Sequence, residues 1–202
     1  MQARPETEEI TEGRQMFEGT LVHASHLHRL QVRKGTDIPY VSHLLAVAAL
    51  VLEYGGDYVL ASAALLHDAV EDAGLDDVRE VYGDRVADVV LACTDTEEGG
   101  DPSKKAPWRE RKERAHERLR SASPDAVLVA ACDRLHNLRC QNADWKHGNH
   151  RAVKFNSTMT ERAWAAWASL EVLRDKIPQR LEADLADEVA LFEAHAKLND
   201  AE

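Results

Sequence analysis

The chain has 202 residues, of which 30% are charged and 44% are apolar, and its formal net charge at pH 7 is −11. This composition is typical of a globular protein with a real core, and we predict one domain over residues 1–202. The negative charge argues against a nucleic-acid-binding surface, so a phosphate-bearing ligand would have to be held by local cations or by a metal ion.

Neither targeting nor membrane insertion is expected from the sequence. Met1 to Glu9 is polar and acidic, and the longest apolar run, Leu44 to Leu52, is far too short to cross a bilayer. Cys93, Cys132 and Cys140 have no zinc-site spacing and are odd in number, so we interpret them as reduced core residues. We therefore expect a cytoplasmic protein without a membrane partner.

Apolar periodicity predicts helices along most of the chain. Asp57 and Ser123 are expected N-caps, Pro124 suits a first helical position, Gly83 separates two short helices, and Pro178 separates the last two. No strand alternation of useful length occurs, so the predicted fold is an all-α bundle of eight to ten helices. The expected helices cover about residues 11–31, 40–54, 57–72, 76–82, 84–94, 108–120 and 125–144, followed by two C-terminal helices within 150–198.

Four ionisable residues end an apolar, helix-forming run that begins at Ala61: His67, Asp68, Glu71 and Asp72. Such groups are costly to bury without a partner. On a continuous helix, His67 shares a face with Glu71, and Asp68 shares a face with Asp72. This spacing predicts a site with two tiers, the first able to reach one metal ion. The alternative is a helix end with a solvated acidic face.

Two other helices carry ionisable residues beside apolar runs. His43 precedes a run of apolar residues, and Asp133 directly follows the apolar stretch 126–132. The histidines at positions 23, 26 and 28 look like a ligand cluster, but a helix turns them to different faces, so we interpret them as core and surface residues.

Charged segments suggest where a ligand could be held. Arg33 and Lys34 form a pair of cations beside a turn, and Arg109 and Lys112 lie on a basic helix, from which one or two side chains could face a phosphate. The turn-rich segment from Thr96 to Pro107 is either a lid or a solvated connector.

Several motifs, in this order, resemble those of a known family. His43, His67-Asp68 and Asp133 resemble the His, His-Asp, Asp pattern of the HD phosphohydrolase superfamily, whose members bind one divalent metal through these residues. The longer stretches resemble the hydrolase domain of RelA/SpoT proteins, and the similarity covers about residues 28–139. These stretches are Gln31 to Lys34, Pro39 to His43, Ala63 to Asp72 and Asp133 to Arg139.

The resemblance implies an HD-type helical fold and removal of the 3′-pyrophosphate from (p)ppGpp. Without a synthetase domain, the chain is similar to the stand-alone alarmone hydrolases, which include the metazoan SpoT homologues. It departs from the family pattern at Ala130, where RelA/SpoT hydrolases commonly have Lys, and at Leu44, where they have Pro. Ala165-Ala166 replaces an aromatic pair expected from similar small bacterial HD proteins.

The predicted metal site consists of His43, His67, Asp68 and Asp133. Two imidazoles and two carboxylates form a mixed nitrogen and oxygen set, which suits one divalent ion such as Mn²⁺ with open positions for water. Such an ion would acidify a bound water and neutralise charge on the attacked phosphoryl oxygen. Glu71 and Asp72 are predicted to orient that water or move its proton.

The predicted substrate contacts surround this site. Arg33 could stack on a purine, Lys34 could pair with a phosphate, and Asn137 could bind a ribose or hold Asp133. Arg109 and Lys112 complete the set of candidate substrate-binding residues.

Alternative functions stay open at this point. The runner-up enzymes are a 5′-nucleotidase and an NADPH 2′-phosphatase-like HD phosphatase. A non-catalytic nucleotide sensor is the alternative outside the enzymes, although the pair Glu71 and Asp72 favours catalysis. The sequence does not decide the oligomeric state.

Overall fold

The computed structural model describes residues 7–70, 77–94, 106–149 and 156–199, and these ranges contain nine named helices and no named strand. An isolated antiparallel bridge joins Val32 to Pro39. The predicted all-α class is therefore confirmed for this part of the chain. The helices are α1 (Glu8–Leu27), α2 (Val41–Glu53), α3 (Tyr58–Leu66), α5 (Val78–Tyr82), α6 (Asp84–Cys93), α7 (Trp108–Ser121), α8 (Pro124–Lys146), α9 (Met159–Leu173) and α10 (Gln179–Asn199).

The helix ends follow the capping residues of the sequence. Asp57 accepts a hydrogen bond from the Leu60 amide at 2.8 Å, and Ser123 accepts one from the Ala126 amide at 3.2 Å. Each side chain satisfies an amide that has no partner within its helix. Gly83 adopts a φ of 81° between α5 and α6, a conformation that glycine takes without steric cost.

The predicted helix over residues 57–72 is wrong in its continuity. The regular helix α3 ends at Leu66, His67 and Asp68 form a turn, and Ala69 and Val70 are helical again. The carbonyl of Ala64 would accept from the Asp68 amide on a continuous helix, and it receives the imidazole N–H of His67 at 2.7 Å. The first helix lies earlier in the chain than predicted, since it begins at Glu8 and ends at Leu27.

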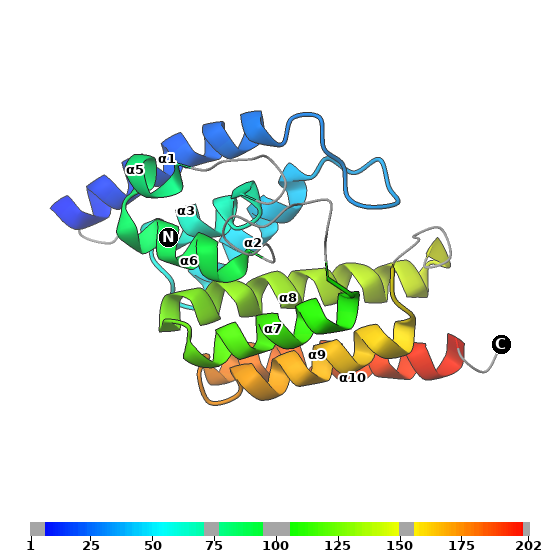
Figure 1. Ribbon diagram of the computed structural model, residues 1–202. Helices are drawn as coiled ribbons and strands as arrows, with labels where there is room; N and C mark the ends of the chain where they lie inside the picture. Colours follow the sequence, from blue (N-terminus) through cyan, green and yellow to red (C-terminus); the bar gives the residue numbers. More distant parts are fainter. Residues whose placement is uncertain (1–6, 71–76, 95–105, 150–155, 200–202) are drawn as a thin grey trace.

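The long helix α8 runs through the middle of the molecule (Figure 1). Helices α1, α2, α3, α5 and α6 lie on one side of it, and α7, α9 and α10 lie on the other. The apolar first half of α8 is buried between these groups, from Ala126 to Leu135 with few exceptions. Because α8 contacts both α2 and α3, its middle turn can meet residues from both helices.

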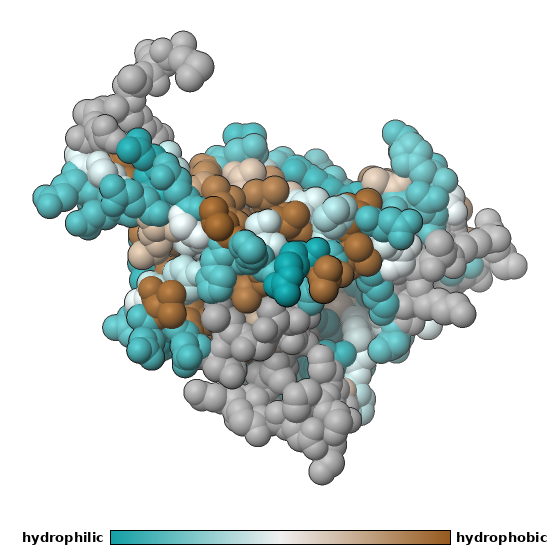
Figure 2. Space-filling view, turned by 90° about the horizontal axis from the view of Figure 1, so that it is seen from above, coloured by the Kyte–Doolittle hydropathy of each residue, from teal (hydrophilic) through white to brown (hydrophobic). Residues whose placement is uncertain are grey.

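The surface, the helices and the cysteines can be compared with what the sequence predicts. On the face shown in Figure 2, hydrophobic and hydrophilic side chains are interspersed across the middle, and hydrophilic ones predominate toward the edges. No helix in the described ranges combines the length and apolarity that a membrane span requires. Cys93, Cys132 and Cys140 are free thiols, as expected, and Cys132 is fully buried.

Candidate metal centre

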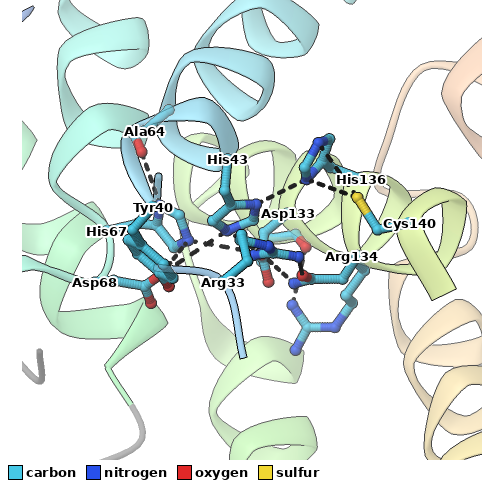
Figure 3. Close-up of polar contacts among 12 residues, drawn as sticks. Arg33, Tyr40, His43, Ala64, His67, Asp68, Asp133, Arg134, His136 and Cys140 are labelled. Atoms are coloured by element: carbon cyan, nitrogen blue, oxygen red, sulfur yellow. Dashed lines mark hydrogen bonds and ion pairs between the residues drawn. The ribbon is translucent and has the colours of Figure 1, made fainter. Parts of the chain in front are cut away.

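Four side chains from three parts of the chain converge beside α8 (Figure 3). His43 lies in the first turn of α2, His67 and Asp68 follow the end of α3, and Asp133 lies in the middle of α8. Asp133 Oδ1 is 3.2 Å from His43 Nε2 and 3.5 Å from His67 Nε2. Asp68 Oδ2 is 3.0 Å from His67 Nε2 and 3.8 Å from His43 Nε2.

These separations fit a single metal ion. With metal–ligand bonds of about 2.1 Å, neighbouring ligand atoms lie about 3.0 Å apart in an octahedral site and about 3.4 Å apart in a tetrahedral one. The ligand atoms of His43, His67 and Asp133 all lie within 4.8 Å of one another, and Asp68 adds an oxygen next to both imidazoles. His67 Nε2 is buried and faces the two carboxylates, with Asp68 Oδ2 at 3.0 Å and Asp133 Oδ1 at 3.5 Å, as a nitrogen that binds a metal would.

Each of the four candidate ligands also contacts a further protein group outside the set, which we call its outer partner. The His67 Nδ1–H donates to the Ala64 carbonyl, so the neutral ring carries its lone pair on Nε2, toward the site. His43 Nδ1 lies 2.8 Å from His136 Nδ1, the Tyr40 hydroxyl donates to Asp68, and the Asn137 amide donates to Asp133 at 2.6 Å. Such partners fix ligand orientation and tautomer.

Burial and charge set the protonation of the centre. Burial by itself lowers the pKa of His67, but the carboxylates of Asp68 and Asp133 outweigh it and hold that pKa well above 6.5. Burial would raise the pKa of Asp133, whereas His43 and His67 hold it well below its usual range. Burial, with His43 and Arg33 nearby, lowers the pKa of His136 to about 4, so its neutral ring can accept from His43. A divalent ion would therefore displace a proton from an ion-paired cluster.

The centre opens into a cavity of about 270 Å³ that reaches from α8 to α7 and α9. Its walls carry Asp68 and Asp133 at one end, together with four cationic side chains, Lys112, Arg118, Arg134 and Arg162. Ala130, Ala165 and Ala166, the three alanines that differ from the expected family pattern, all line this same cavity. The cavity therefore combines candidate metal ligands with cationic side chains that could hold an anionic ligand.

A protein-family model described as an HD domain matches residues 20–190, which is most of the chain. The chain belongs to the HD-domain family. Mouse MESH1, a guanosine-3′,5′-bis(diphosphate) 3′-pyrophosphohydrolase, is 37% identical over 141 residues, which cover 65% of this chain and 74% of MESH1. The predicted resemblance to the SpoT-type hydrolases is thereby confirmed as homology.

Two solved structures extend the comparison to the whole HD-domain fold. A metazoan orthologue of SpoT that hydrolyses ppGpp superposes with a TM-score of 0.69 and 25% sequence identity, covering 93% of this chain and 97% of the orthologue. A Listeria monocytogenes protein superposes with a TM-score of 0.62 and 25% identity, covering 75% of this chain and 99% of that protein. The similarity thus includes the C-terminal helices, beyond the motifs of residues 28–139.

Two of the predicted substrate contacts form a chain behind the metal centre of this HD domain. Arg33 donates to the Asn137 side-chain oxygen at 2.8 Å, and Asn137 in turn donates to Asp133. Of the two roles predicted for Asn137, the structure has it holding Asp133. Arg33 also lies over the Tyr40 ring, 5.9 Å from its centroid, so its guanidinium already has two partners next to the site.

The other predicted site residues divide into four groups. Lys112 lines the cavity, and Lys34 is exposed in the loop after Arg33. Arg109 is not among the lining residues, because its guanidinium stacks on Trp164 at 3.9 Å from the ring centroid and bonds Glu113. Glu71 and Asp72, the predicted proton-transfer pair, lie outside the described residues, as does most of the segment from Thr96 to Pro107.

The histidines of the first helix do not join the metal centre. His28 is buried, contacts Gln31 and stacks on Tyr40 with 5.3 Å between ring centroids. His23 contacts Tyr82, and His26 is exposed. They occupy core and surface positions, in line with the interpretation from helical spacing.

Tyr40, His136 and Arg134 were missed as functional candidates. Tyr40 precedes His43 by three residues and His136 follows Asp133 by three, a spacing that places neighbours on one helical face and could have identified both. Arg134 gives no such signal, because adjacent helical residues point in different directions. Its location in the cavity depends on how α9 packs against α8.

Proposed function

We propose that this protein is a metal-dependent phosphohydrolase that removes the 3′-pyrophosphate from ppGpp. The observation that carries the proposal is the convergence of His43, His67, Asp68 and Asp133 beside a cavity lined with cations. Homology to MESH1 over 74% of that enzyme's length supports the choice of substrate.

The ion assigned to the centre is Mn²⁺, held by the two imidazoles and two carboxylates. This nitrogen and oxygen set without sulfur suits a divalent catalytic ion better than a closed structural zinc. When bound, the ion supplies Lewis-acid chemistry, because it lowers the pKa of water and neutralises charge on a phosphoryl oxygen.

The chain's own residues bind and orient the substrate. Lys112, Arg118, Arg134 and Arg162 provide positive charge for the phosphates in a protein whose net charge is −11. Arg33 acts through Asn137 on Asp133, and Lys34 stays a candidate phosphate contact at the surface. Glu71 and Asp72 are assigned to proton transfer on the strength of the motif that they complete after His67-Asp68. A cytoplasmic location fits this substrate.

The test is turnover by the Mn²⁺-loaded protein. We expect it to convert ppGpp to GDP and pyrophosphate, separated by ion-exchange chromatography, and to lose this activity when a chelator removes the ion. Hydrolysis of NADPH or of 5′-mononucleotides, with ppGpp untouched, would reassign the substrate within the phosphatases. Nucleotide binding without hydrolysis of any of them would instead identify a sensor.

A further inference from the structure

Arg134 follows Asp133 on α8 and extends from the helix on the side of that carboxylate (Figure 3). It is half-buried and lines the cavity together with Asp133. Its Nε–H donates to Ser169 Oγ at 3.1 Å, and its Nη1 donates to the Ala130 carbonyl at 2.9 Å. A guanidinium has five N–H donors, so these two bonds leave the Nη2 end of the group available to the cavity.

Arg134 forms no ion pair with a carboxylate among the described residues. Its hydrogen bonds go to neutral oxygens. Asp68 and Asp133 together carry two negative charges, which a divalent ion in the metal centre would neutralise. The positive charge of the half-buried Arg134 guanidinium would then have no negative counterpart, and an anionic ligand would supply one.

A buried polar relay from α7 through α9 fixes the guanidinium. Ser169 Oγ lies 2.9 Å from His116 Nε2, and both residues are less than a tenth exposed. Burial, with nearby Arg134, Lys112 and Arg120, lowers the pKa of His116 to about 4, so the ring is neutral near pH 7. The His116 ring also bonds the Ala165 backbone, and in the tautomer that donates there Nε2 accepts the Ser169 hydroxyl proton while Ser169 Oγ accepts from Arg134.

We propose that Arg134 binds a phosphate group of the substrate through its Nη2 end, and that Ser169 and His116 are positioning residues that aim it. The proposal rests on the proposed phosphohydrolase function, because the phosphate in question belongs to the substrate of that reaction. It gives α7 and α9, which contribute no metal-centre side chain among the described residues, a part in the reaction.

The main test compares Arg134→Gln with wild type in the metal-loaded protein. A charge-assisted hydrogen bond to phosphate predicts a KM for ppGpp raised about tenfold or more, with bound metal and Tm unchanged. Arg134→Lys, which keeps the charge but not the bond to Ser169, should give a smaller rise. Arg79→Gln, an exposed arginine on α5 that pairs with Asp84 and Asp88, is the matched control.

Ser169→Ala separates positioning from general support of the fold. In the wild-type background it should raise KM, and in the Arg134→Gln background it should raise KM no further, because its effect acts through Arg134. A merely structural serine would lower Tm equally in both backgrounds and leave KM unchanged. An unchanged KM in Arg134→Gln overturns the proposal. If that variant does not fold, the KM values of Arg134→Lys and Ser169→Ala decide.

A second readout keeps this proposal separate from the proposed function. Titration with inorganic phosphate should raise the Tm of the metal-loaded wild-type protein, and this rise should be lost in Arg134→Gln but kept in Arg79→Gln. If the wild type hydrolyses no ppGpp but shows this pattern, the assignment of Arg134 stands and the substrate is wrong. If phosphate raises the Tm of wild type and Arg134→Gln equally, or raises neither, the assignment of Arg134 as a phosphate-binding residue is wrong.

Discussion

The cavity has two sides that differ in how their side chains are held. On the side of α2, α3 and the middle of α8, four potential ligands each have an outer partner that fixes orientation, such as Tyr40 for Asp68 and Asn137 for Asp133. On the side of α7 and α9, the wall combines long cationic side chains with Ala165 and Ala166.

The difference between the two sides of the cavity suggests that one side carries the reaction chemistry and the other selects the substrate. A metal centre needs ligand atoms at fixed separations, so its residues and their partners are tightly constrained. Binding of phosphates and a base tolerates changes in wall shape, and all three alanine departures of the sequence lie on the cavity wall. The metal-centre side should therefore determine the reaction class, and the α7 and α9 side should determine which nucleotide enters. The following predictions test that division, from the largest expected effect to the smallest.

Removal of a ligand should abolish both metal binding and turnover. His67→Ala and Asp133→Ala leave the remaining charged groups uncompensated, and we expect losses well beyond the roughly 10–100-fold typical of outer-partner changes. Elemental analysis and kcat on the same preparations measure this. His26→Ala, an exposed histidine on α1, is the matched control. A His67→Ala protein with full metal content and an intact fold would remove His67 from the centre.

Substitutions in the proton-transfer pair, Glu71 and Asp72, should lower turnover without lowering the amount of bound metal. We expect Glu71→Gln and Asp72→Asn to lower kcat on the order of 10²-fold or more, the usual size of a general acid or base contribution. Bound metal and Tm should be unchanged. A stable, metal-loaded double variant with near wild-type kcat would contradict the assignment.

The outer partners should have intermediate effects. Loss of the Tyr40 hydroxyl or of the Asn137 amide frees a carboxylate to rotate, so Tyr40→Phe and Asn137→Ala should lower metal affinity or kcat by roughly 10–100-fold. Competition with a chromogenic chelator measures the affinity. Tyr58→Phe, at the opposite end of α3 from His67, controls for loss of a tyrosine hydroxyl. Wild-type affinity in both variants would show that the ligands are held without these bonds.

A larger side chain on the α9 wall should alter substrate binding only. Ala166→Leu narrows the cavity, and we expect a change in KM for ppGpp of about tenfold, upward, with bound metal unchanged. Ala168→Leu on the same helix does not line the cavity and should leave KM as in wild type. Loss of metal in Ala166→Leu would contradict the division between the two sides.

The buried His116 should make a small contribution to acid sensitivity. Its pKa is about 4 in the folded protein against 6.5 for an ordinary histidine, so the unfolded chain binds a proton first. Stability from this group is present above about pH 6.5 and is lost as the pH falls toward 4, by at most about 1.4 kcal/mol per pH unit. His116→Gln should flatten that slope in urea unfolding at a series of pH values. His136, whose pKa is also about 4, should keep part of the slope. An unchanged slope would show that His116 titrates normally.

Local sequence information was sufficient for most of the helices and for the candidate metal set. Caps such as Asp57 and Ser123 act within one turn, and apolar periodicity determines which face of a helix is buried, so both can be recognised without a structure. The candidate metal residues could be selected in the same way, since ionisable residues stand beside apolar runs and the order of the motifs matches the HD family. These residues are His43, His67, Asp68 and Asp133.

Only the tertiary structure decided how these residues meet. The turn at His67 and Asp68 interrupts a segment with strong helical propensity, and at this turn the His67 side chain bonds the Ala64 carbonyl, a contact that no periodicity predicts. The pairing of Arg33 with Asn137 spans 104 residues, and the relay from His116 through Ser169 to Arg134 joins three helices. Such contacts depend on how helices pack against one another, and side-chain spacing along one helix carries no information about the position of the next.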